Sequence, residues 1–240
     1  MTSRWQEELS VSARGTGRIS DQHIVDRIRH AVLTQRLPPN TRLPEVTLGE
    51  VFGVSRSVIR KALTRLASDH VIVQQPNQVA RVAAPDVAET REIFAARRLV
   101  EGEVVSLLCG AFDGAQYGAL ETLVHAEQLA YEQGDESRRI EQSLAIHHYL
   151  ADHSPNRILG VMLTDLILRT SIVIALYKRS GMTSCYLEND HADLLALLRE
   201  GKADIARRHV QTHLESLENL LDLSAPDTDI DLASIFAFNV

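Results

Sequence analysis

The chain is poor in cysteine and has no apolar N-terminal segment, and both absences narrow its class. Its 240 residues include two cysteines, Cys109 and Cys185, which lie among apolar neighbours without a CxxC spacing. A disulfide framework or a thiolate metal site is therefore not expected, and both side chains are predicted to be small buried core residues. The first 18 residues are polar where a secretory signal needs an apolar core, and no apolar run is judged long enough to cross a membrane. These features predict a cytoplasmic protein.

An overall positive charge is also lacking, since the formal net charge is −7. The charges are unevenly distributed along the chain. Residues 1–85 contain 12 Lys and Arg against 7 Asp and Glu, a net charge of +5, whereas residues 86–240 have a net charge of −12. This asymmetry favours a basic N-terminal module that faces phosphate groups and an acidic remainder that does not contact them.

Apolar periodicity divides the chain into four parts. Residues 1–17 have no periodic apolar pattern and are expected to form a flexible arm. Residues 18–84 predict short helices and a hairpin, and residues 86–222 predict longer helices. Pro85 marks the boundary because a proline restricts the preceding residue to extended geometry. Residues 223–240 are expected to form a C-terminal tail, and packing on the helices and packing on a partner subunit both stay open.

The N-terminal module has the order of parts of a winged helix-turn-helix. Ser20 is a good N-cap for a first helix, which ends before a pair of prolines. Two short amphipathic helices then follow, joined by a turn at Gly53. Beyond them, β-branched runs at residues 71–73 and 79–82 predict a hairpin that forms the wing.

The second of the two short helices predicts a basic surface. Its apolar residues recur at helical spacing and are expected to face inward. This buried stripe consists of Val58, Ile59, Ala62, Leu63 and Leu66. The polar residues at the start of the helix can point outward, where Arg can bond the edge of a guanine through two donors. The alternative is that these residues form an ordinary solvent-exposed charged face without a DNA-binding role.

After Pro85 the pattern is almost entirely helical, with no strand signal. Short breaks separate six stretches of helical periodicity, as is expected for antiparallel neighbours in a bundle. The predicted helices cover roughly residues 87–112, 116–133, 137–153, 156–178, 183–199 and 203–222. The predicted fold is therefore mainly α, with an N-terminal winged helix-turn-helix followed by an all-α antiparallel helical bundle.

Both halves of the chain resemble parts of one family of bacterial regulators. The segment VSRSVIRKALTRLASDHVI is similar to the hallmark of the GntR DNA-binding domain. The remainder resembles the FCD effector domain of the FadR-type subfamily. Its landmarks are Arg97 with Glu101, His147 followed by Asn156, His191 after an acidic residue, and His213 before Leu214. Together the two similarities cover about residues 18–222, and they imply a DNA-binding transcriptional regulator.

The resemblance implies a set of DNA-binding residues. Arg56 and Arg60 are one helical turn apart and are the first candidates for base contacts. The family usually has a glycine near the tip of the wing, where this chain has Asn77, a residue that tolerates positive φ. The full set of candidates is Ser55, Arg56, Ser57, Arg60, Arg42, Asn77 and Gln78.

The resemblance also implies a divalent metal site. In many FCD domains three histidines, with an aspartate one turn before the first of them, bind a metal such as zinc or nickel. The matching residues here are His147, His191 and His213, with Ser143 at the aspartate position. Metal binding is expected to be weakened, because three neutral imidazoles face a dication with only water or an effector carboxylate to balance its charge. The nearby Asp190 is expected to point to a different face of its helix.

Two arrangements of the effector site stay open. Either the three histidines hold a metal whose coordination shell is completed by an effector carboxylate, or the cavity is metal-free and the histidines bond the effector directly. Arg97 and Ser143 are the candidate effector-binding residues. Arg97 matches a position that faces the ligand cavity in relatives, where its fork of donors suits an organic acid. Its alternative role is an ion pair with Glu101 on the helix surface.

The function implied is a ligand-responsive transcriptional regulator, expected to repress a metabolic operon in response to a small organic acid. One recognition helix reads only a half-site, so a homodimer on palindromic double-stranded DNA is expected. Two other classes stay open. One is a metal-dependent enzyme built on the helical domain, although no carboxylate is placed as an obvious general base. The other is a DNA-binding protein without an effector.

Overall fold

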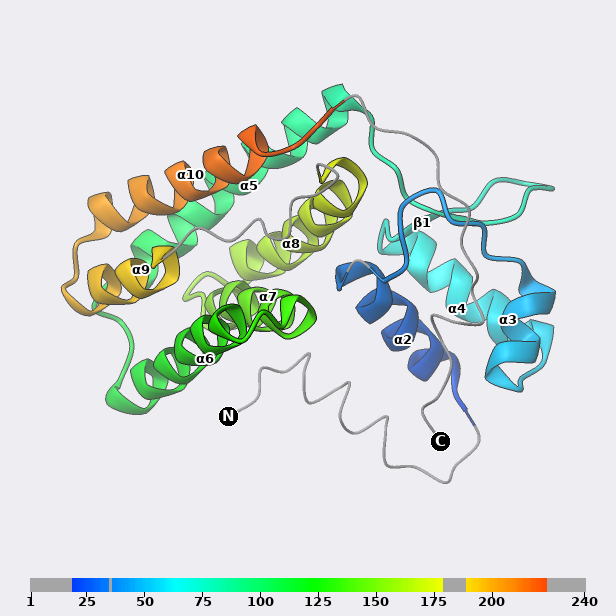
Figure 1. The fold of residues 1–240 in the computed structure, drawn as a ribbon, viewed down its shortest axis with the longest axis horizontal. Coiled ribbons are helices and arrows are strands. Elements are labelled where there is room, and N and C mark those ends of the chain that lie inside the picture. The colour runs from blue at the N-terminus through cyan, green and yellow to red at the C-terminus, as the bar shows by residue number, and fades with distance from the viewer. Residues whose placement is uncertain (1–18, 35, 179–188, 224–240) are drawn as a thin grey trace. The chain divides into compact units, whose positions relative to one another are not determined.

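The computed structural model describes residues 19–34, 36–178 and 189–223 (Figure 1). The chain divides into two compact units: an N-terminal unit with the described residues up to Asp86, with which residues 171–177 are grouped, and a helical unit with residues 87–170 and 178–222. The predicted flexible arm at residues 1–17, nearly all of the predicted tail at residues 223–240, and Cys185 lie outside the described residues.

Short helices and a small hairpin make up the N-terminal unit. Helix α2 (Asp21–Leu33) begins at Ser20, whose hydroxyl accepts a hydrogen bond from the backbone amide three residues later at 3.2 Å, so the predicted N-cap is confirmed. Helix α3 (Glu45–Phe52) ends at Gly53, and α4 (Arg56–Ser68) follows it. Gly53 has a φ of +64°, which glycine adopts at little cost, and this conformation permits the sharp turn between α3 and α4.

The core of the N-terminal unit forms where α4 packs against α2 and α3. The predicted apolar stripe of α4 is buried, except that Val58 is only partly buried. At the surface, Arg29 Nη2 and Asp69 Oδ2 lie 2.5 Å apart and join α2 to the end of α4. The fully buried apolar side chains include Ile24, Ile28, Leu48, Ile59, Leu63 and Leu66.

The wing hairpin is shorter than the sequence predicts. Strands β1 (Ile72–Val73) and β2 (Arg81–Val82) pair in antiparallel register. The predicted second strand over residues 79–82 is wrong at its start. The Ala80 carbonyl instead accepts a hydrogen bond from the Leu43 amide at 2.8 Å. Ala80 therefore pairs with the segment before α3 and not with β1.

The helical unit is an antiparallel bundle, as predicted. Its helices are α5 (Val87–Leu108), α6 (Gly114–Glu132), α7 (Glu136–Asp152), α8 (Arg157–Tyr177), α9 (Asp190–Arg199) and α10 (Ala203–Asn219). Helix α5 lies along α10, and α6 packs against α7 and α9 (Figure 1). Asp113 and Asp135 cap α6 and α7 by accepting a hydrogen bond from the amide three residues later. The fold of the chain is therefore mainly α.

Two sequence predictions about apolar character are wrong. Helix α8 is long and apolar enough to cross a membrane by length and composition, with a mean hydropathy of 1.9, because Asp165 and Arg169 are too few charges to lower it. Only 44% of that apolar stretch is buried. The core helix of a soluble protein can be equally long and apolar, so length and composition alone are weak evidence for a membrane span. Cys109 is partly exposed rather than fully buried, since it lies just beyond the end of α5, where the chain turns at Gly110.

Candidate metal centre and nucleic-acid interface

The N-terminal end of α4 presents exposed polar side chains. The apolar stripe of this helix faces α2 and α3, so the opposite face is open to solvent. Four predicted residues lie together there, and the hydroxyls of Ser55 and Ser57 are 2.9 Å apart. This exposed group consists of Ser55, Arg56, Ser57 and Arg60.

The two arginines of this group differ in their partners. Arg60 donates from Nε and Nη2 to both carboxylate oxygens of Glu45 on α3, at 3.0 and 2.9 Å. The hydrogen bond from Arg60 lowers the pKa of Glu45, so this carboxylate is ionised at neutral pH. Arg56 has no ion pair within 4 Å among the residues that the structure describes. Its guanidinium is therefore the more available of the two.

The remaining predicted residues of this surface are exposed but lie on other elements. Arg42 forms an isolated bridge with Arg81, so it borders the wing. Asn77 and Gln78 lie at the tip of the wing. Asn77 has a φ of +60°, which confirms that the turn forms without a glycine.

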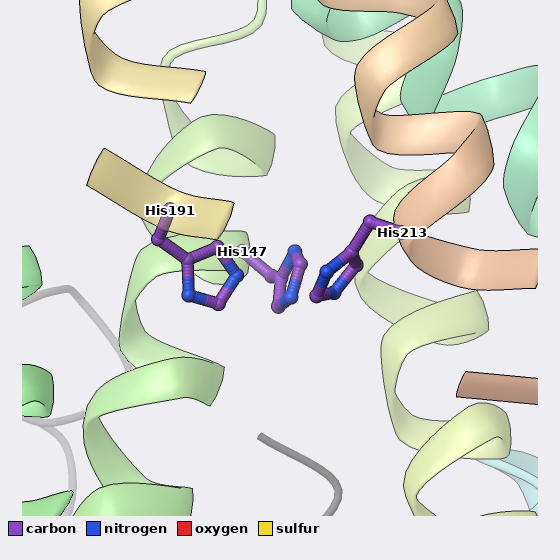
Figure 2. A group of neighbouring side chains, drawn as sticks. All are labelled: His147, His191 and His213. Atoms are coloured by element: carbon purple, nitrogen blue, oxygen red, sulfur yellow. The ribbon is translucent and has the colours of Figure 1, made fainter. Parts of the chain in front are cut away.

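In the helical unit, three histidines from three helices meet in the core. His147 lies on α7, His191 on α9 and His213 on α10, and each is 7% exposed or less (Figure 2). Their ring centroids are separated by 5.0 to 5.6 Å, and one ligating nitrogen of each lies within 4.8 Å of those of the other two. The sequence prediction that these residues converge is confirmed as geometry.

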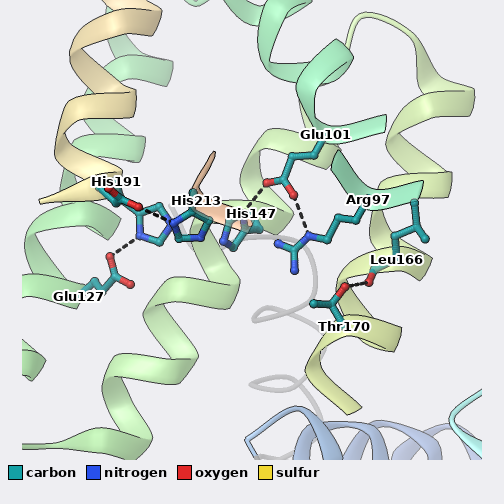
Figure 3. A network of polar contacts seen from close by, with 9 residues as sticks. Arg97, Glu101, Glu127, His147, Leu166, Thr170, His191 and His213 are labelled. Carbon is teal, nitrogen blue, oxygen red and sulfur yellow. Dashed lines mark hydrogen bonds and ion pairs between the residues drawn. The ribbon is translucent and has the colours of Figure 1, made fainter. Parts of the chain in front are cut away.

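Each of the three histidines has a carboxylate on its Nδ1 atom (Figure 3). The distances are 2.5 Å from His147 to Glu101 on α5, 2.6 Å from His191 to Glu127 on α6, and 2.7 Å from His213 to Asp190 on α9. An ionised carboxylate only accepts hydrogen bonds, so Nδ1 donates in each pair and Nε2 of a neutral ring keeps its lone pair. This is the arrangement that orients metal-binding histidines in proteins.

Burial is the largest influence on the histidine pKa values, because it disfavours the charged ring. It lowers the pKa of His147 to about 4 against the opposing charge of Glu101, and it also lowers the pKa of His213. For His191 the charge and the hydrogen bond of Glu127 outweigh burial, and the pKa is raised. His147 and His213 are therefore neutral at pH 7, which is the form that binds metal.

The residues present fit a divalent metal. The Nε2 atoms of His191 and His213 are buried and have no hydrogen-bond partner among the described residues, which is costly for a ring nitrogen unless something else binds it. Three imidazole nitrogens suit zinc or nickel better than magnesium or calcium. The three histidines could therefore hold such an ion, with Ser143 one turn before His147 on α7.

The sequence-based expectation about charge at this site is wrong. It left only water or an effector to balance a dication, but Glu101, Glu127 and Asp190 all lie against the histidine rings. Asp190 does not join the ligating nitrogens, as expected, yet it bonds the far side of His213 from the neighbouring helix. Each carboxylate lies on a different helix from the histidine that it contacts, so the spacing of residues along one helix could not indicate these pairs.

Arg97 has a buried position rather than a surface one. Its Nε donates to Glu101 Oε2 at 2.7 Å, so the ion pair proposed from the sequence exists, but Arg97 is only 3% exposed. Its Nη2 atom is buried without a hydrogen-bond partner among the described residues. Arg97, Glu101 and His147 form a continuous series of polar contacts inside the bundle (Figure 3).

Sequence reasoning missed the role of Glu127, although a signal was available. The residue lies in the apolar stripe of α6, at the helical spacing of Leu120, Leu123, Val124 and Ala130, all of which are buried. A carboxylate within an apolar stripe is rare unless it has a specific partner. The partner itself, His191, is distant in sequence and could not be identified from the spacing.

A winged helix-turn-helix with an exposed basic helix, joined to a helical bundle with a polar core, defines a transcriptional regulator. The family model for bacterial regulatory proteins of the gntR family matches residues 20–82, and the FCD domain model matches residues 92–216. The chain belongs to the GntR family and carries an FCD domain. These families consist of DNA-binding regulators and not of enzymes, so the enzyme alternative is set aside.

Individual proteins agree with this assignment. The HTH-type transcriptional regulator YdhC of Bacillus subtilis (strain 168) is 24% identical over 82% of this chain and 90% of its own length. The structure of E. coli McbR/YncC has a TM-score of 0.72 at 22% identity, over 82% of this chain and 95% of that chain. A GntR regulator from Rhodococcus sp. RHA1 has a TM-score of 0.71 at 18% identity, over 83% and 95% of the two chains. The two structures support the fold alone.

The buried Arg97–Glu101 pair leads to a prediction about stability. The Glu101→Gln variant leaves the Arg97 guanidinium in the core without its counter-charge, which is expected to lower the free energy of unfolding by about 3–5 kcal/mol. Urea unfolding of the metal-free protein measures this loss. The Asp165→Asn variant breaks the more exposed pair with Arg169 and is expected to cost less than about 1 kcal/mol. Equal losses for the two variants would contradict the structural role of the buried pair.

Proposed function

We propose that this chain represses a metabolic operon from a palindromic operator, as a cytoplasmic homodimer controlled by a small organic acid at a divalent metal site. In this proposal residues 18–84 bind DNA, and residues 86–222 bind the effector and form the dimer. One observation carries the proposal: His147, His191 and His213 meet in the core, where Nε2 of His191 and of His213 has no partner among the described residues, in a chain whose other unit exposes a basic helix.

The DNA-binding part rests on the N-terminal end of α4. An exposed Arg56 without an ion pair among the described residues is free to bond a guanine through two donors. Arg60 reaches DNA when its exposed pair with Glu45 gives way, and such exposed pairs are worth little. Ser55 and Ser57 suit phosphate or base contacts beside them, and Arg42 with the wing tip extends the same kind of contact.

Removing Arg56 tests this assignment. A bidentate contact to a base is worth about 1–3 kcal/mol of discrimination, so Arg56→Ala is expected to lose most of its preference for a duplex selected from a random pool by the wild-type protein. Gel shifts in the presence of excess non-specific DNA measure the preference. Arg91→Ala on α5 removes one exposed positive charge from the other unit and is expected to keep specific binding. Unchanged specificity in Arg56→Ala would remove this residue from the interface.

The effector part rests on the polar chain inside the bundle. Three imidazoles, each neutral when it binds a metal, would leave coordination positions that a carboxylate can fill, and the metal would supply the positive charge that attracts it. Arg97 Nη2 is a buried donor without a partner among the described residues, which suits a second carboxylate oxygen. Ser143 lies one turn before His147 and offers a hydroxyl. These groups favour a small organic acid over an apolar effector.

Metal content tests this part directly. The purified protein, after reconstitution with zinc or nickel, is expected to hold about one ion per chain and to melt at a higher temperature than the chelated protein. His213→Ala should lose both the ion and the gain in melting temperature. His125→Ala, which changes an exposed histidine on α6, should keep both. Small carboxylates should then raise the melting temperature of the loaded protein further. No stoichiometric metal after reconstitution would refute the three-histidine site.

The dimer part rests on apolar side chains of α8 that are exposed in the part of the chain that the structure describes. Ile158, Val161 and Met162 recur at helical spacing at the start of α8, and their side chains are 65%, 66% and 47% exposed. Such a face is unfavourable in water unless another surface covers it. A second copy is the occupant we propose, because a palindromic operator requires two recognition helices related by a two-fold axis.

A charge placed on this face tests the dimer. Val161→Asp is expected to convert the protein to a monomer, because an isologous interface would then bury two facing carboxylates. Sedimentation velocity gives the mass of the wild type and of the variant. The matched control is Ile205→Asp on α10, which changes a side chain that is 45% exposed and should leave the dimer intact. A monomeric wild type, or a dimeric Val161→Asp, would contradict the proposed interface.

A further inference from the structure

Glu127 is the carboxylate of the histidine cluster whose position is least explained by protein partners alone. It is 2% exposed, and its Oε2 accepts from His191 Nδ1 at 2.6 Å. Its Oε1 atom is also buried and has no hydrogen-bond partner among the described residues. A buried carboxylate with an empty acceptor is expensive, since its hydration is lost and only partly replaced.

The other two carboxylates of the cluster are better compensated. Glu101 shares its charge with Arg97, whose Nε lies 2.7 Å away. The Asp190 side chain is 25% exposed, so water screens its charge. Glu127 has neither advantage, because no Lys or Arg pairs with it in the described part of the chain and its side chain is only 3% exposed.

The charges around the histidines leave a deficit of positive charge. In the metal-binding form, in which all three imidazoles are neutral, three carboxylates and the guanidinium of Arg97 give a net charge of −2. The atoms that could bind the metal are then neutral nitrogens, so the negative charge lies behind the rings and not among the ligating atoms. A divalent cation between the rings would bring the group to neutrality.

We infer that Glu127 is a positioning residue for the metal, which holds His191 with its Nε2 toward the site and supplies buried negative charge that the ligating atoms lack. The inference rests on the metal site proposed above. A carboxylate behind a ligating imidazole fixes the tautomer and the direction of the ring, and it makes the nitrogen a better donor to the metal.

Ser143 is the α7 side chain that lies nearest in sequence before His147 on the same helix face. It lies four residues before His147 and helps to lower the pKa of Glu127, although no hydrogen bond joins the two side chains among the described residues. A hydroxyl tolerates a neighbouring carboxylate, whereas a second carboxylate at residue 143 would repel it. The inference therefore predicts that the site accommodates one carboxylate at this position, either at residue 127 on α6 or at residue 143 on α7.

The Glu127→Gln variant tests the inference because glutamine keeps the size of the side chain and an acceptor for His191 while removing the charge. Its affinity for Co²⁺ is expected to fall about 10- to 100-fold, measured by competition with a chromophoric chelator. The visible absorption of bound Co²⁺, which reports coordination geometry, should change as well. Glu132→Gln, at an exposed position on the same helix, should match the wild type in both measurements.

Stability without metal separates a positioning role from a structural one. Because no Lys or Arg pairs with Glu127 in the described part of the chain, chelated Glu127→Gln should be about as stable to urea as the chelated wild type. Metal should then raise its melting temperature less than that of the wild type. A chelated variant that is clearly less stable, with an unchanged response to metal, would show that Glu127 serves the fold alone and would overturn the inference.

A rescue variant completes the test. Ser143→Asp in the Glu127→Gln background returns a carboxylate to the same corner, and it is expected to recover Co²⁺ affinity to within about tenfold of the wild type. Wild-type affinity in Glu127→Gln alone would overturn the inference while the metal site stands. Absence of Co²⁺ binding by the wild type would instead refute the metal site and the inference together.

Discussion

The helical unit depends on carboxylates that are buried against imidazole rings. Glu101 and Glu127 lose their hydration inside the bundle, and only a close hydrogen-bond donor recovers the lost free energy. The partners come from different helices, so the pairs are satisfied only when α5, α6, α7, α9 and α10 pack in one arrangement. The same pairs direct the remaining ring nitrogens to a common point (Figure 2). The carboxylate–imidazole pairs therefore account both for the packing of these helices and for the geometry of the candidate metal site.

A similar ion pair has a different consequence in the N-terminal unit. Arg60 and Glu45 are joined by two hydrogen bonds, as Arg97 and Glu101 are joined by one, but the Arg60 side chain is 65% exposed. Water screens the exposed pair, which costs little to open, whereas the buried pair can be broken only with a large loss. The exposed pair can therefore be exchanged for a phosphate or a base, and the buried pair holds a fixed geometry.

Local patterns predicted the helices, because burying one face of a helix leaves a period in the sequence that needs no knowledge of its partner. The cap at Ser20 and the turn at Gly53 followed from the conformational preferences of single residues. Prediction failed where a distant segment decided the outcome. The second wing strand begins late because Ala80 pairs with Leu43, nearly 40 residues earlier. Helix α8 combines an apolar composition with incomplete burial, which its period does not show.

The sequence by itself determined the class of fold and the basic face of α4, because both are matters of residue type and helical spacing. The three histidines that meet in the bundle were indicated by the resemblance to the FCD domain. Only the tertiary structure decided which charges surround those histidines. Glu127 and His191 are 64 residues apart, and Glu101 and His147 are 46 apart, so no local pattern connects them. Electrostatic pairing in a core depends on distances of a few ångströms between helices, and the packing of the whole bundle sets those distances.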